Sequence, residues 1–101
     1  GGSRYQDYTM RTSGRSYQDI LAAGGGIFDS VSKTQQAESE DLLQNLIRRA
    51  DKHLNGGVTT IEVKTGYGLE TAHELRLLEV IRDAKSVVKA DLVPTCLAAN
   101  V

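Results

Sequence analysis

Apolar residues recur at intervals of three and four over residues 39–54, which is the spacing of one face of an α-helix. Ser39 precedes the first apolar residues and is the expected N-cap of this helix. The glycine pair Gly56-Gly57 follows the last apolar position and ends the pattern. The spacing therefore predicts a helix over 39–54.

The pattern changes to β-branched residues over 58–64, which predicts a strand bounded by glycines. Thr71 and Glu74 resemble a capping box that opens a second helix, continuing to about Ser86. An apolar run over 92–98 predicts a second strand. These segments form a βαβ unit with an expected right-handed crossover, and the preceding helix gives an αβαβ order.

The first 26 residues carry less apolar patterning. Residues 1–15 are polar without a clear period, and Ser16 with Asp19 resembles a capping box for a short helix over 17–23. The glycine triplet at 24–26 lacks the GxGxxG spacing and a preceding strand. We therefore interpret it as helix termination and close packing rather than as a phosphate loop.

Composition limits the class of protein. The 101 residues carry 12 basic and 13 acidic side chains, so charge favours neither nucleic acid nor an anionic membrane as partner. No apolar run approaches the roughly 20 residues that span a bilayer. A single cysteine excludes an internal disulfide and suits a reducing cytoplasm. We expect a cytoplasmic chain whose residues 1–101 lie in one domain with no boundary inside.

Both ends of the chain look cut. The sequence opens Gly-Gly-Ser-Arg without an initiator methionine and closes just as the second predicted strand ends. A parallel sheet must be covered on both faces, and a closed (β/α)₈ barrel takes about 250 residues. We therefore expect a piece of a longer α/β protein that needs the remainder, or self-association, to cover its sheet.

Ligands of parallel α/β sheets bind beyond the carboxyl ends of the strands. Tyr67 stands there between Gly66 and Gly68, and Asn100 follows the second strand. The glycines allow a sharp turn that leaves the phenol facing a cleft. Tyr67 and Asn100 would then contact one small molecule, although an aromatic lid over the rim is an equal alternative for Tyr67.

Other charged residues fit structural roles at least as well as chemical ones. Glu62 and Lys64 are two apart on one strand and point the same way, which favours an ion pair over catalysis. Arg4 lies in a polar stretch, where it is either solvated or a clamp for a carboxylate.

Histidine and cysteine indicate no metal site. His53 and His73 have no further ligand at metal-binding spacing, so we predict surface positions for both. Cys96 has no local partner and falls within the second predicted strand, so we predict that it lies in the core.

Four segments, in this order and spacing, resemble the imidazolonepropionases of the amidohydrolase superfamily. They are "GGSR" at 1–4, "SYQDILAAGGGI" at 16–27, "GVTTIEVKTGYGLETAHELRLLEVI" at 57–81 and "PTCLAAN" at 94–100. The resemblance implies a metal-dependent hydrolase of histidine degradation, which opens the imidazolone ring of 4-imidazolone-5-propanoate to give N-formimidoyl-L-glutamate. It also implies that the chain is an internal fragment of a (β/α)₈ TIM barrel.

The resemblance assigns substrate contacts by position. It implies that Arg4 binds the propionate of the substrate and that Tyr17 and Tyr67 line the pocket. Asn100 stands where the family has a histidine that contacts the substrate. An amide forms hydrogen bonds but carries no proton at neutral pH, so the chemistry at this position is altered.

The resemblance also implies zinc or iron in the full-length protein. The family's histidine pair would lie just before Gly1, and its other ligands and acid–base residues beyond Val101, so this chain holds no metal ligand or catalytic residue. We expect the chain alone to be inactive. Two alternatives stay open: another cyclic amidohydrolase or deaminase with a changed pocket, or a small α/β module that binds without chemistry.

Overall fold

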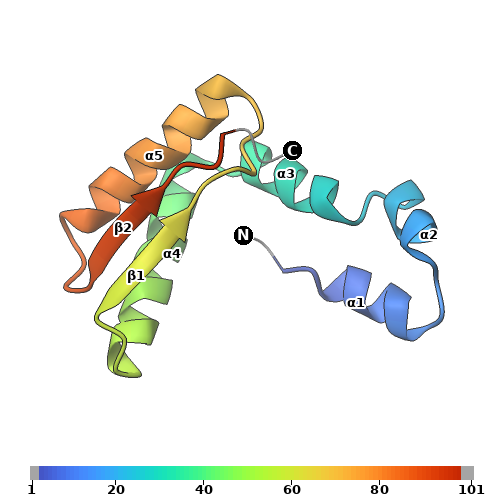
Figure 1. Cartoon of the computed structure of the whole chain (residues 1–101), viewed down its shortest axis with the longest axis horizontal. Helices are drawn as coiled ribbons and strands as arrows, with labels where there is room; N and C mark the ends of the chain where they lie inside the picture. The colour runs from blue at the N-terminus through green and yellow to red at the C-terminus, as the bar shows by residue number, and fades with distance from the viewer. Residues whose placement is uncertain (1–2, 99–101) are drawn as a thin grey trace. The chain divides into compact units, whose positions relative to one another are not determined.

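The computed structural model describes residues 3–98 and divides the chain into two compact units, residues 1–36 and 37–101 (Figure 1). The first unit contains the helices α1 (Tyr5–Thr12), α2 (Tyr17–Ala22) and α3 (Ile27–Gln36). The second unit contains α4 (Ser39–Asn55), β1 (Thr60–Lys64), α5 (Thr71–Lys85) and β2 (Asp91–Thr95). Within residues 3–98, none of the helices combines the length and apolarity that crossing a bilayer requires.

The second unit is a parallel βαβ arrangement preceded by a helix. β1 and β2 pair in parallel, with a register that runs from Thr60 opposite Asp91 to Lys64 opposite Thr95. The α/β class and the predicted αβαβ order are therefore confirmed. The helix predicted over 39–54 is observed within one residue of its expected end.

The core of this unit lies on one face of the sheet. It contains Ala50 of α4, Ala84 of α5 and Leu92 of β2. Half-buried side chains from α4, from β1 and from the segment between α5 and β2 pack against these three: Leu43, Leu46, Ile47, Ile61, Val63 and Val88. On β1 the alternate residues Thr60, Glu62 and Lys64 are exposed, so the two helices cover one face and leave the other open to solvent.

The second strand is shorter than predicted, and this changes the position of Cys96. β2 ends at Thr95, whose carbonyl accepts the N–H of Thr65 at 3.0 Å. The next N–H in the ladder, that of Leu97, donates to the Thr65 side-chain Oγ1 at 3.2 Å. Because a hydroxyl replaces the backbone carbonyl there, the strand stops, and Cys96 is exposed after it. The core position predicted for Cys96 is wrong.

Helix capping agrees with the sequence at one site. The Ser16 N–H donates to Asp19 Oδ2 at 3.2 Å, and the Asp19 N–H donates to Ser16 Oγ at 3.1 Å. This reciprocal pair is a capping box, and it confirms the predicted start of α2.

The caps predicted for the two longer helices are wrong by one residue. α4 and α5 take Glu38 and Glu70 as N-caps, and neither glutamate side chain makes a capping hydrogen bond. Ser39 and Thr71 are already helical, because the preceding glutamate carries the extended backbone of an N-cap. Glu74 therefore lies four residues after the N-cap, beyond the position from which a capping box closes.

The first unit is more helical than its pattern indicates. In α1 the buried residue is Asp7, and in α3 two of the three buried residues are Ser30 and Thr34. A face of polar or small residues produces no apolar period, so neither helix was predicted. The glycine triplet acts as expected, since the Gly25 N–H donates to the Ile20 carbonyl at 2.8 Å and ends α2.

Candidate functional site

The turn after β1 presents Tyr67 at the carboxyl end of the strand. Gly66 has φ +126°, a conformation that favours glycine. A Cβ atom on Gly68 would lie 2.9 Å from the Glu74 nitrogen, so this glycine allows the turn to approach the start of α5. The two glycines therefore have separate backbone roles, and the Tyr67 side chain is exposed between them. The sharp turn is confirmed, whereas the ligand contact of Tyr67 stays a prediction.

Both strands end at the same rim of the sheet. The register pairs Lys64 with Thr95, and Thr65 bridges the two chain segments that continue beyond the rim. The Tyr67 turn follows the first strand, and the segment leading to Asn100 follows the second. Asn100 itself lies outside the described residues, so its predicted approach to Tyr67 is not tested.

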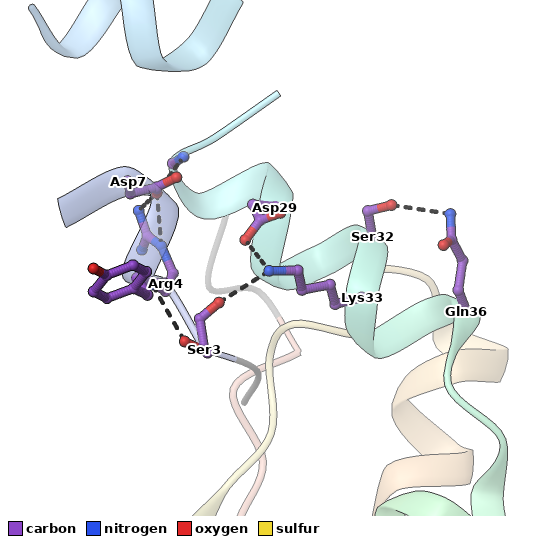
Figure 2. A network of polar contacts seen from close by, with 9 residues as sticks. Ser3, Arg4, Asp7, Asp29, Ser32, Lys33 and Gln36 are labelled. Atoms are coloured by element: carbon purple, nitrogen blue, oxygen red, sulfur yellow. Dashed lines mark hydrogen bonds and ion pairs between the residues drawn. The ribbon is translucent and has the colours of Figure 1, made fainter. Parts of the chain in front are cut away.

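In the first unit, three N–H donors converge on one carboxylate oxygen of Asp7 (Figure 2). Arg4 Nε–H donates to Asp7 Oδ2 at 2.8 Å, and a second guanidinium nitrogen of Arg4 pairs with the same oxygen. The Gly26 N–H donates to it at 2.8 Å. This side chain links α1 to the turn between α2 and α3.

These donors stabilise the charged form of Asp7. The hydrogen bond from Arg4 and the one from Gly26 hold the pKa of Asp7 below its ordinary value of 3.8, although burial acts in the opposite direction. The positive charges of Arg4 and Lys33 add to the lowering. Asp7 therefore stays ionised at neutral pH and pairs with Arg4 as a carboxylate.

A second pair of contacts holds the segment before α1. Lys33 Nζ donates to the Ser3 carbonyl at 2.9 Å and forms an ion pair with Asp29 Oδ2 at 2.9 Å (Figure 2). Arg4 follows Ser3 directly, so its backbone is held on one side by α3 and its side chain by Asp7.

The other candidates of the first unit are less constrained. Tyr17 is the first residue of α2 and is exposed, with the guanidinium carbon of Arg11 lying 6.0 Å from its ring centroid. Arg4 and Tyr17 lie in the first unit and Tyr67 in the second. The convergence of the three on one substrate therefore stays a prediction.

The structural roles predicted for Glu62 and Lys64 and for the two histidines are confirmed in part. Lys64 Nζ and Glu62 Oε1 lie 3.3 Å apart on β1, which confirms the predicted ion pair. His53 is exposed as predicted, whereas His73 is half-buried on α5.

Two buried carboxylates were missed. Asp7 carried a local signal, because Arg4 and Asp7 are three residues apart and can meet on one helical turn. Glu74 is 4% exposed, and among residues 3–98 neither of its carboxylate oxygens has a hydrogen-bond partner. The sequence had assigned Glu74 to a cap, so its burial was not foreseen.

No metal-binding cluster occurs in the part of the chain that the structure describes. There, no three histidine, cysteine, aspartate or glutamate side chains are grouped closely enough to hold an ion.

Comparison with known proteins gives one consistent result. The chain is 46% identical over 99 residues to the imidazolonepropionase of Haloarcula marismortui, covering 98% of this chain and 24% of that protein. It is 48% identical over 100 residues to that of Alkaliphilus metalliredigens, and 44% identical over 100 residues to that of Pseudomonas aeruginosa. These alignments cover 99% of this chain and 24% and 25% of the relatives, respectively. No family model matches the chain.

The resemblance indicated by the four sequence segments is thus confirmed. The chain spans about a quarter of the length of the curated relatives that it matches.

Proposed function

We propose that this chain is an internal part of an imidazolonepropionase and that the full-length protein opens the imidazolone ring of 4-imidazolone-5-propanoate. The observation that carries the proposal is the identity of 44% to 48% over nearly the whole chain to proteins of that name. Hydrolysis adds one water across the cyclic amide C–N bond and gives N-formimidoyl-L-glutamate. The similarity to named enzymes favours this reading over a binding module without chemistry.

The proposed fold of the full-length protein is a (β/α)₈ barrel. Two parallel strands covered by helices on one face are the repeating unit of such a barrel, and the other face would point to its interior. Glu62 and Lys64 lie on that exposed face. The remaining strands would cover it, and the 101 residues would form part of a single catalytic domain in the cytoplasm.

Within this proposal the chain supplies contacts to a small-molecule substrate. Arg4 has the planar, permanently charged group that suits the propionate carboxylate. Tyr67 stands at the carboxyl rim of the strands, where barrel enzymes bind substrates, and Tyr17 would line the same pocket. Asn100 would follow the second strand at that rim and donate or accept a hydrogen bond.

The metal implied by the relatives does not fit the residues described here. A zinc or iron ion would activate water for attack on the ring carbonyl, and it needs several histidine or carboxylate ligands. Residues 3–98 contain no such group. Its ligands would belong to the remainder of the full-length protein, and the isolated chain would be inactive.

A second candidate is another cyclic amidohydrolase or a deaminase. Asn100 favours it, because an amide stands where the resemblance implies a histidine and cannot transfer a proton. Such a pocket would prefer a related ring that needs no proton transfer at this position.

An assay of the full-length, metal-loaded protein separates the two candidates. We expect ring opening of 4-imidazolone-5-propanoate, measured by the loss of its ultraviolet absorbance and the appearance of N-formimidoyl-L-glutamate. Turnover of other cyclic amides without turnover of this substrate would favour the second candidate. Asn100→His is then the informative variant, since an unchanged rate would place residue 100 outside the reaction path.

The role of Arg4 has its own test in the same protein. Replacing it with alanine removes a charged hydrogen-bond donor, and we expect a loss of substrate binding of about 1.5–3 kcal/mol, seen as a KM raised roughly 10- to 150-fold. Arg82→Ala is the matched control, because the Arg82 side chain is exposed on α5. An unchanged KM in Arg4→Ala would remove the clamp assignment.

A further inference from the structure

The pair formed by Arg4 and Asp7 is asymmetric. The Arg4 side chain is 44% exposed, whereas the Asp7 side chain is 10% exposed. A buried carboxylate that accepts a backbone N–H as well as the guanidinium is fixed on two sides. Asp7 is therefore the anchored partner of the pair, and Arg4 is the partner presented to solvent.

The geometry differs from that of a carboxylate held in an arginine clamp. A clamped carboxylate usually gives one oxygen to each of two guanidinium nitrogens. Here the two guanidinium nitrogens of Arg4 that contact Asp7 donate to the same oxygen, Oδ2. Asp7 therefore orients the guanidinium from one side and does not imitate a bidentate ligand.

The Gly25-Gly26 turn forms the site that the Asp7 carboxylate occupies, here called its seat. Gly26 has φ +75° and directs its N–H to Oδ2, and a Cβ on Gly25 would come within 2.5 Å of Oδ1. Both oxygens of Asp7 thus lie against the turn. The glycine triplet lacks the spacing of a phosphate loop, and the anion that its Gly26 N–H binds is a side chain of the same chain.

We propose that Asp7 is a positioning residue, which fixes the guanidinium of Arg4 against the Gly25-Gly26 turn so that Arg4 can receive the carboxylate of a ligand. The inference rests on the proposed function, because that function makes Arg4 the clamp for the propionate. A flexible arginine loses rotational freedom when it binds. An arginine already held by Asp7 loses less, so Asp7 raises affinity without contacting the substrate.

The negative charge of Asp7 and its positioning of Arg4 have opposite effects on the affinity for an anionic ligand. Removing the negative charge of Asp7 would leave Arg4 more attractive to an anion, while also releasing its side chain. The sign of the change in KM therefore decides between a positioning residue and a competing anion.

The test replaces Asp7 with asparagine in the full-length enzyme. Asparagine still accepts the Gly26 N–H but cannot form the ion pair. We expect KM for 4-imidazolone-5-propanoate to rise about tenfold with kcat within about twofold, and KM for the neutral propanamide analogue to stay unchanged. In the Arg4→Ala background, Asp7→Asn should add no further rise. Asp83→Asn, which breaks the exposed Arg82–Asp83 pair on α5, is the control and should leave both KM values unchanged.

Four kinetic outcomes overturn the proposal. A lower KM for the propanoate in Asp7→Asn would mean that Asp7 competes with the substrate for Arg4. An unchanged KM would mean that Asp7 has no effect on substrate binding. An equal rise in KM for the propanoate and the propanamide would reduce its role to stability. A further rise in the Arg4→Ala background would show an effect that does not pass through Arg4.

A second measurement does not depend on activity or on the folding of a variant. In the wild-type full-length protein, we expect the Arg4 Nε–H to exchange with water at least tenfold more slowly than the exposed Arg82 Nε–H, as followed by nuclear magnetic resonance. Equal exchange rates would overturn the positioning of Arg4. If the enzyme does not hydrolyse the imidazolone but this protection is present, the proposed function fails while the Arg4–Asp7 arrangement stands.

Discussion

Among the described residues, each unit buries one carboxylate next to a glycine-containing turn, and the two carboxylates differ in their hydrogen-bond partners. Asp7 is 7% exposed and Glu74 is 4% exposed. Asp7 accepts two donors from Arg4 and one from Gly26. Glu74 follows the Tyr67 turn at the start of α5, and both of its oxygens lack a hydrogen-bond partner among residues 3–98.

This difference in hydrogen-bond partners indicates that the first unit satisfies its buried carboxylate by itself, whereas the described part of the second unit does not. The donors of Asp7 all come from residues 4–26, within one unit. A buried carboxylate without a donor costs about 1–3 kcal/mol or more, and the helix dipole offsets this only in part. A donor from protein beyond the described residues would satisfy Glu74, and this would agree with the proposal that the second unit belongs to a larger barrel.

The largest effect that tests this comparison is expected at Gly25. In Gly25→Ala, the new methyl group would lie 2.5 Å from Asp7 Oδ1 and from Ile20 Cγ2, so the carboxylate must leave its seat. We expect a loss of about 3 kcal/mol in the free energy of unfolding, measured by urea denaturation. Gly24→Ala is the control, since it meets nothing within 4 Å and costs about 1 kcal/mol through its φ of +85°. Equal losses in the two variants would mean that the seat of Asp7 is not tightly packed.

The next effect is expected at Glu74, and its sign depends on the surroundings. Glu74→Met in the 101-residue chain should raise the free energy of unfolding by about 1–2 kcal/mol, because it removes a buried charge without a donor. The same change in the full-length protein should lower it by a similar amount, since a donor would be left unpaired. Chemical denaturation of both forms gives the two signs.

Glu79→Met on the exposed side of α5 is the control for Glu74, with an expected change within about 0.5 kcal/mol. A gain in stability from Glu74→Met in the full-length protein would contradict the comparison. It would show that Glu74 stays unsatisfied even when the rest of the protein is present.

These two regions also show what the sequence allowed us to predict. The elements of the second unit were predicted because their buried and half-buried residues, such as Leu92, Ile47 and Ile61, are apolar and keep the period of a helix or a strand. α1 and α3 were missed because their buried positions include Asp7 and Ser30. A polar side chain that is buried through hydrogen bonds adds nothing to the apolar periodicity, so its burial cannot be predicted from a hydropathy pattern.

The candidate site was predictable to a similar degree. The turn at Gly66 and Gly68 followed from strand position and glycine chemistry, and the structure gives each glycine a separate backbone role. The contact between Asp7 and Gly26 spans 19 positions, which no local pattern specifies. Glu74 was misassigned because a capping box depends on the exact helix start, and that start was wrong by one residue.

A smaller effect is expected from pH. The folded-state pKa of Asp7 is lowered, mainly by the hydrogen bond from Arg4 and then by that from Gly26. Its contribution to stability is therefore fully present above the ordinary value of 3.8 and is lost as pH falls through the lower folded value. We expect the difference in free energy of unfolding between wild type and Asp7→Asn to be constant near neutral pH and to shrink below about pH 4. A difference that grows on acidification would contradict the ionised pair.

The smallest effect is expected at the Glu62–Lys64 pair, where the comparison extends to the open face of the sheet. The side chains are 51% and 62% exposed, respectively, so a double-mutant cycle with Glu62→Gln and Lys64→Met in the 101-residue chain should give a coupling below about 0.5 kcal/mol. That coupling should disappear at about 1 M salt, because exposed charges are screened. In the full-length protein, the proposed barrel would cover this face and exclude salt, so we expect a stronger coupling that salt does not remove. The same weak, salt-sensitive coupling in both forms would mean that the face stays in solvent, and the barrel would lose its main structural support.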